Sequence, residues 1–270
     1  MSVLHTHEVG RAGPRVAFLH GLFGQGRNWL QIAKGVAGDS GGDARCLLVD
    51  LPDHGRSPWS REFSFSSYAD AVATTLRSAA PAERWTVVGH SLGGKVAMVL
   101  ALTQPGLVER LAVVDIAPKS YRSLERFEGY IDEMRSLPLA QLTSRADAEA
   151  RFDEPDAAVK AFLLQNLRRD GQTWRWQANL DLIAGDAARG TGSRIAAWPA
   201  EAAQAPAYEG PVLWLVGAQS RYVQPEDAQA MRALFPAARQ VTVKGAGHWV
   251  HTDAPEVVVG ALRRFVADPA

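Results

Sequence analysis

The chain has 270 residues, 47% of them hydrophobic and 21% charged, which is typical of one large globular domain that can carry an inserted subdomain. Lysine plus arginine and aspartate plus glutamate both number 29, so no excess charge favours nucleic acid or a membrane surface, and the expected partner is a small molecule. The single cysteine, Cys46, cannot form an intrachain disulfide, and no apolar run near Met1 is long enough for a signal peptide or a transmembrane span, so we expect a cytoplasmic protein.

Short apolar runs alternate with longer amphipathic stretches along most of the chain. The predicted strands are 15–19, 44–50, 84–88, 111–115, 212–216 and 240–243, with a weaker pattern near 2–9. Helical spacing is found at 28–36, 66–78, 93–102, 225–234 and 255–266. This order predicts an α/β fold with a mostly parallel central sheet and helices on both faces.

The stretch from 119 to 207 departs from that alternation. It is rich in arginine, alanine, leucine and glutamate, has helical spacing at 124–137 and 157–168, and shows no strand pattern. We predict a helical cap (lid) subdomain over 119–207, inserted into a core domain made of 1–118 and 208–270, with a flexible joint at 185–192. Its aromatic residues either line a pocket or fill the interior of the cap: Phe127, Tyr130, Phe162, Trp174 and Trp176.

The strongest chemical signal is Gly89-His90-Ser91-Leu92-Gly93, a G-x-S-x-G pattern between a predicted strand and a predicted helix. Small residues on either side of Ser91 allow a tight turn that lifts its hydroxyl out of the sheet. A plain turn is the alternative, but the strand and helix on either side favour a nucleophile. The helix that begins near Leu92 would also direct its free amides and positive dipole end toward a developing oxyanion.

A glycine-rich turn, His20-Gly21-Leu22-Phe23-Gly24, closes an earlier predicted strand. Acyl transfer needs two donors that face the oxyanion of the tetrahedral intermediate. We expect the backbone amides of Leu22 and Leu92 to form this oxyanion hole, with Phe23 as the alternative to Leu22. For the His20 side chain we expect a structural role.

A candidate general base lies in Gly247-His248-Trp249-Val250-His251, where a strand again runs out into glycines. Histidine near neutral pH can take the serine proton and return it to the leaving group. His248 follows the strand directly and is the preferred base. His251 approaches the next helix and is interpreted as a solvated or structural neighbour.

Several motifs together resemble the α/β-hydrolase superfamily, over a match from Arg15 to the C-terminal helix: His20-Gly21, 50–57, 89–94 and Gly247-His248. Four segments are similar to the YbfF-type serine esterases: 89–95, 114–118, 174–180 and 220–223. The resemblance implies the α/β-hydrolase fold and hydrolysis of carboxylic ester or thioester bonds without a cofactor. It also implies that the turn at 53–57 is structural.

The position of the catalytic acid is unusual. Most of the superfamily places it after the strand at 211–216, where this chain has Gly217-Ala218-Gln219-Ser220 and no carboxylate. Glu226 and Asp227 begin a helix, where acids commonly serve the dipole and the cap. Asp115 instead ends the strand that follows the one before Ser91, at the sheet edge where such folds gather their sites, and the resemblance implies the same choice. Its alternative role is a cap at the entry to the inserted segment.

These residues predict a serine hydrolase that cleaves esters, or thioesters such as acyl-CoA, of small to medium acyl groups. Ser91 would attack, His248 would act as base, Asp115 would orient His248, and an acyl-enzyme would form. A perhydrolase or carbon–carbon bond hydrolase could use the same triad, and a non-catalytic binding protein is the alternative from another class. Ser91 argues against the carboxylate nucleophile of dehalogenases and epoxide hydrolases.

The sequence has few further signals for ligand binding. No histidine, cysteine or acidic cluster has metal-ligand spacing and no phosphate-binding loop is present, so neither a metal nor an organic cofactor is expected. Phe23 and Tyr222 are the candidate substrate-binding residues. The sequence indicates no oligomeric state.

Overall fold

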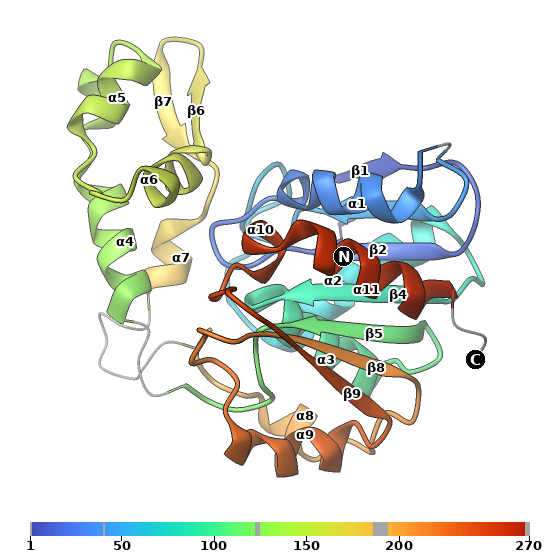
Figure 1. Ribbon diagram of the computed structural model, residues 1–270. Helices are drawn as coiled ribbons and strands as arrows, with labels where there is room; N and C mark the ends of the chain where they lie inside the picture. The colour runs from blue at the N-terminus through green and yellow to red at the C-terminus, as the bar shows by residue number, and fades with distance from the viewer. Residues whose placement is uncertain (1, 40, 122–124, 186–193, 268–270) are drawn as a thin grey trace.

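The structure is a computed structural model that describes residues 2–39, 41–121, 125–185 and 194–267 (Figure 1). One sheet has the strand order β1-β3-β2-β4-β5-β8-β9. Strand β1 pairs antiparallel with β3, and all the other pairs are parallel. The strands are β1 Thr6–Val9, β2 Arg15–Leu19, β3 Arg45–Val49, β4 Trp85–His90, β5 Val108–Val114, β8 Val212–Gly217 and β9 Ala238–Val243. The predicted α/β class is confirmed.

The register brings four loops to one edge of the sheet. His90 pairs with Val114, and Val114 pairs with Leu215. Gly217 at the end of β8 pairs with Val243 at the end of β9. Because parallel strands in register end together, the residues that follow β4, β5, β8 and β9 emerge side by side.

Helices cover both faces of the sheet because successive strand residues point to opposite sides. On β5, for example, Val113 belongs to the buried cluster under α2 and α3, whereas Val114 belongs to the cluster under α1 and α11. The helices of the core are α1 Leu30–Ala37, α2 Phe65–Ala79, α3 Leu92–Thr103, α9 Ala228–Leu234, α10 Val250–Asp253 and α11 Pro255–Ala267. Short 3-10 turns precede or join helices at η1 Gly26–Trp29, η2 Leu139–Gln141 and η4 Pro225–Asp227.

Between β5 and β8 the chain leaves the sheet. This inserted segment contains α4 Glu125–Ser136, α5 Arg145–Arg151, α6 Ala157–Leu164, β6 Leu167–Asp170, β7 Thr173–Trp176, α7 Leu180–Ala184 and α8 Ala200–Ala203. Figure 1 shows α4 to α7 standing beyond one end of the sheet, while α8 lies back against the core and contacts α3.

The prediction that the inserted segment contains no strand is wrong. Strands β6 and β7 form an antiparallel hairpin, with Leu167 opposite Trp176. The helix predicted at 157–168 ends at Leu164, so Arg168 lies in β6 instead. The sequence pattern of this hairpin is weak because each strand has only four residues and several of them are charged. Gly171, with φ of 60°, supplies the left-handed turn between the strands.

Two further expectations are not tested by the fold. The joint predicted at 185–192 lies outside the described residues apart from Gly185, and the division into core and cap stays a prediction.

Among the described helices, none is both long enough and apolar enough to cross a bilayer.

Candidate active site

Ser91 lies on a sharp turn between β4 and α3. Its φ of 51° and ψ of −114° are rarely adopted by a residue with a side chain, and strain of this kind costs on the order of 1–3 kcal/mol. Glycine is required at Gly93, because a Cβ there would lie 2.5 Å from the carbonyl oxygens of Leu19 and His20. The turn leaves Ser91 at the surface of a cleft, with 8% of the residue exposed.

Ser91, His248 and Asp115 form one hydrogen-bonded chain. The Ser91 Oγ lies 3.1 Å from Nε2 of His248, and Nδ1 of His248 lies 2.7 Å from Oδ2 of Asp115. Since a carboxylate can only accept, Nδ1 carries the proton and Nε2 is left to accept from the serine hydroxyl. This is the tautomer that a general base needs.

Asp115 is held by the loop in which the sequence lacks an acid. The residue is fully buried. The backbone N–H of Gly217 donates to Oδ1 over 3.0 Å, and the hydroxyl of Ser220 donates to Oδ2. The last residue of β8 and the loop that follows it therefore supply two donors to a carboxylate at the end of β5. The sequence alone does not predict this role of Ser220. The available signal is its position after β8, where most of the superfamily has the acid that contacts the histidine.

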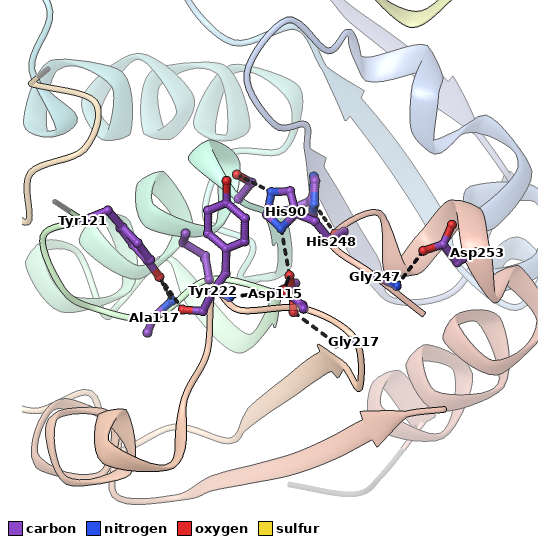
Figure 2. A network of polar contacts seen from close by, with 12 residues as sticks. His90, Asp115, Ala117, Tyr121, Gly217, Tyr222, Gly247, His248 and Asp253 are labelled. Carbon is purple, nitrogen blue, oxygen red and sulfur yellow. Dashed lines mark hydrogen bonds and ion pairs between the residues drawn. The ribbon is translucent and has the colours of Figure 1, made fainter. Parts of the chain in front are cut away.

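Tyr222 lies flat against the imidazole of His248. The ring centroids are 3.9 Å apart and the planes are inclined by 21°. The hydroxyl of Tyr121 donates to the Tyr222 carbonyl over 2.8 Å and accepts from the Ala117 N–H over 2.9 Å (Figure 2). An aromatic face against the ring stabilises an imidazolium and fixes its plane.

The loop that carries His248 is held from two other sides. The ring of His90 donates from Nε2 to the His248 carbonyl over 2.9 Å. The N–H of Gly247 donates over 2.8 Å to the side chain of Asp253, the last residue of α10 (Figure 2). Burial holds the pKa of His90 well below its usual value, so its ring is neutral.

The competing candidates for base and acid lie in other surroundings. His251 stacks on Trp29 with ring centroids 4.4 Å apart, and burial lowers its pKa to about 3. Asp227 accepts from Lys119 over 2.6 Å and from the Gln224 N–H over 2.8 Å. Neither residue takes part in the hydrogen-bonded chain from Ser91.

The candidate oxyanion donors border the serine. Leu92 is the first residue of α3, and first-turn amides have no acceptor within their own helix. Leu22 lines the cleft together with Ser91. Phe23, by contrast, is fully buried, packs against Phe127 with ring centroids 6.4 Å apart, and is not among the described residues that line the cleft.

The cleft has two lobes that meet at Ser91, Leu22 and Phe127. The apolar lobe is further lined by Leu92, Lys95, Ile116, Tyr121, Ile195, Ala196 and Tyr222. The histidine lobe is further lined by His20, Gly21, Gly24, Asn28, His90, Phe162, His248, Trp249 and His251. Among the aromatic residues of the inserted segment, Phe127 and Phe162 reach the cleft, whereas Tyr130 and Trp176 are buried in the hydrophobic interior and Trp174 is packed against it.

Lys95 is the unexpected charge in this site. It comes four residues after Ser91, is 2% exposed, and burial lowers its pKa to about 7.

Within the part of the chain that the structure describes, no cluster of histidine, cysteine and acidic side chains could hold a metal ion.

Comparisons with known proteins agree with this architecture. A family model described as alpha/beta hydrolase fold matches residues 14–255. The mouse sn-1-specific diacylglycerol lipase ABHD11 is 37% identical over 94% of this chain and 81% of its own length. The Escherichia coli esterase YbfF is 29% identical over 94% of this chain and 93% of its own. A solved marine microorganism esterase superposes with a TM-score of 0.89 at 28% identity, over 97% of this chain and 99% of that one.

The family match covers most of the chain, and both curated relatives are named as ester-cleaving enzymes. The chain therefore belongs to the α/β-hydrolase family and is a hydrolase of the carboxylesterase type.

Proposed function

We propose that this hydrolase cleaves carboxylic esters of small to medium acyl groups, and the corresponding thioesters, through an acyl-enzyme on Ser91. The observation that carries the proposal is the continuous chain from Ser91 through His248 to Asp115, with contacts of 3.1 and 2.7 Å. Nucleophile and base are within hydrogen-bond reach, and a third group orients the base, which is the arrangement that activates a serine.

The proposed reaction begins with attack of the Ser91 oxygen on the acyl carbonyl carbon while His248 takes the hydroxyl proton. The N–H groups of Leu22 and Leu92 would hold the oxyanion as it forms. The imidazolium is stabilised by Asp115 on one edge and by the face of Tyr222. His248 then gives its proton to the leaving alcohol or thiol, and a water activated by the same histidine hydrolyses the acyl-enzyme.

The two lobes support a division of the ester between them. The apolar lobe suits an acyl chain because most of its lining side chains are aliphatic or aromatic. The histidine lobe contains Asn28 and several imidazoles and suits a more polar alcohol. A glycerol ester combines these properties, and the mouse relative is named for diacylglycerol.

Labelling tests the nucleophile. A fluorophosphonate probe should label the wild-type protein and fail to label Ser91→Ala, because the probe bonds to an activated serine oxygen. Ser91→Ala should also hydrolyse p-nitrophenyl butyrate at background rate. Wild-type protein that is neither labelled nor active would instead support a binding protein on this fold.

The acid is tested by a pair of substitutions. Asp115→Asn should lower kcat by roughly 10³- to 10⁴-fold, because the amide no longer fixes the tautomer or stabilises the imidazolium. Asp227→Asn, which removes the negative charge that pairs with Lys119 but lies outside the hydrogen-bonded chain, should keep most of the turnover. The opposite ranking of the two variants would overturn the assignment of Asp115.

A substrate panel tests the leaving group and acyl range. Esters and thioesters with the same acyl chains, from acetyl to decanoyl, should both be hydrolysed, with activity lost in Ser91→Ala throughout. A peracid-forming or carbon–carbon-cleaving preference in the same panel would redirect the assignment to another use of the triad.

A further inference from the structure

The buried amine of Lys95 has an unusual set of partners. Its Nζ lies 2.8 Å from the carbonyl oxygens of both Ala196 and Ala197, and 3.3 Å from that of Ile195. The rings of Tyr121 and Phe65 flank it, with centroids at 4.9 and 5.4 Å. Among the described residues, no carboxylate lies within ion-pair distance of it.

This arrangement accounts for all the protons of an ammonium group. An ammonium group has three N–H donors, and the three carbonyl oxygens provide one acceptor for each of them. Burying an ammonium is costly unless it is fully hydrogen-bonded, and aromatic faces add to the compensation. Movement of the three carbonyls away from Lys95 would therefore leave the N–H donors of a buried amine without acceptors.

The residues that Lys95 holds form part of the apolar lobe. Ile195 and Ala196 line that lobe beside Ser91. They belong to the return segment, residues 194–198, which precedes α8 near the end of the inserted segment. The N–H of Tyr121, on the outgoing side, also donates to the Ala196 carbonyl over 2.9 Å. Lys95 thus joins the nucleophile helix α3 to the base of the inserted segment at one wall of the lobe.

We propose that Lys95 is a specificity-determining residue that limits the length of the acyl chain by holding Ile195 and Ala196 as a fixed wall of the apolar lobe. The proposal rests on the proposed acyl-enzyme at Ser91. Lys95 does not act as an anion-binding residue for the substrate, because its three donors already have acceptors in the protein. Loss of these contacts frees the wall and lengthens the lobe.

The test is an acyl-chain series of p-nitrophenyl esters, from acetyl to decanoyl, with wild type and Lys95→Met. Methionine keeps the length and apolar stem of lysine but has no donors. We expect the ratio of kcat/KM for decanoyl over butyryl to rise about tenfold or more in Lys95→Met, because one methylene in an enzyme pocket can change discrimination by that factor. Ile195→Ala, which enlarges the lobe directly, should change the ratio in the same direction.

Two controls make the result specific. Lys34→Met, at an exposed position of α1, should leave the chain-length profile unchanged. Lys95→Gln keeps two donors and should give an intermediate shift, which provides a second reading if the melting temperature of Lys95→Met shows that it does not fold. The proposal would be overturned if the folded Lys95 variants changed kcat/KM by the same factor for esters of every chain length.

Two further outcomes separate the hypotheses. If wild-type protein prefers half-esters of dicarboxylic acids to neutral esters of equal length, and Lys95→Met abolishes that preference, Lys95 binds substrate carboxylate and the wall role is wrong. If Ser91→Ala retains activity toward the series, the acyl-enzyme proposal fails independently of Lys95.

Discussion

Five described non-glycine residues have a positive φ, and three of them are catalytic candidates or adjoin one. Phe23, Ser91 and Asp115 have φ values of 59°, 51° and 52°, in the left-handed region that side chains disfavour. Each costs on the order of 1–3 kcal/mol and persists only because the surroundings fix it. For Asp115, the fixing contacts include the Leu215 carbonyl, which accepts from its N–H over 2.9 Å. The strain directs both the serine and the carboxylate toward one imidazole.

The hydroxyl of Ser220 offers a test at this scale. Ser220→Ala removes a donor to Oδ2 of Asp115, the oxygen that also accepts from His248. A hydrogen bond to a charged group contributes about 1.5–3 kcal/mol, so we expect kcat to fall by roughly 10- to 100-fold while KM changes little. Ser220→Thr keeps the hydroxyl and should recover most of the rate. Equal activity in the alanine and wild-type proteins would show that Gly217 alone holds the carboxylate.

At the scale of elements, side chains of the inserted segment form hydrogen bonds with the loop that follows β2. The buried Asn166 donates from its side chain to the Phe23 carbonyl over 2.8 Å, between α6 and β6. Gln165 accepts from the side chain of Asn28 over 2.9 Å. Since Leu22 adjoins Phe23, these contacts from the inserted segment fix the turn that carries a proposed oxyanion donor.

Loss of the hydrogen bond from Asn166 to the Phe23 carbonyl should reduce stabilisation of the transition state. We expect Asn166→Ala to lower kcat by roughly tenfold with a smaller change in KM, because about one hydrogen bond that fixes the oxyanion turn is lost. It should also weaken binding of a boronic acid transition-state analogue by a similar factor. Gln172→Ala, at the exposed turn of the β6–β7 hairpin, is the matched amide control and should match wild type. A loss confined to KM would instead place Asn166 in substrate binding.

For the whole molecule, a group of buried neutral histidines surrounds the site. Burial lowers the pKa of His20 and of His251 to about 3. The Nε2 of His20 accepts from the Leu51 N–H over 2.9 Å, a contact that a protonated ring cannot make. The His251 ring stacks on Trp29, and its Nδ1 has no hydrogen-bond partner among the described residues. Between about pH 3 and 6.5, these rings therefore stay neutral in the folded protein but bind protons in the unfolded chain.

This predicts a loss of stability in acid. Because the folded pKa values lie below the unfolded value of 6.5, the stabilisation is fully present above pH 6.5 and is lost as the pH falls toward 3, by up to about 1.4 kcal/mol per pH unit for each histidine. His251→Phe keeps an aromatic stack and removes one titrating group, so urea unfolding between pH 6.5 and 4 should show a shallower slope. Trp29→Phe keeps His251 and should retain the wild-type slope. An unchanged slope in His251→Phe would contradict the prediction.

Local patterns predicted most of the core elements. The strand at 15–19 matches β2, and the helix predicted at 93–102 lies within α3, because alternation and helical spacing report directly on buried faces. The hairpin β6–β7 was missed because short, charged strands carry little of that signal. Its formation depends on packing, as the buried end residues Leu167 and Trp176 indicate.

The sequence by itself determined the fold class, the serine turn and the choice of Asp115 and His248 as candidates, because each lies at the end of a recognisable apolar strand. Only the tertiary structure decided how they meet. Ser220 contacts Asp115 across 105 residues, and Lys95 contacts the Ala196 carbonyl across 101. No local pattern encodes such contacts, since they depend on the register of the parallel strands and on where the inserted segment returns to the core.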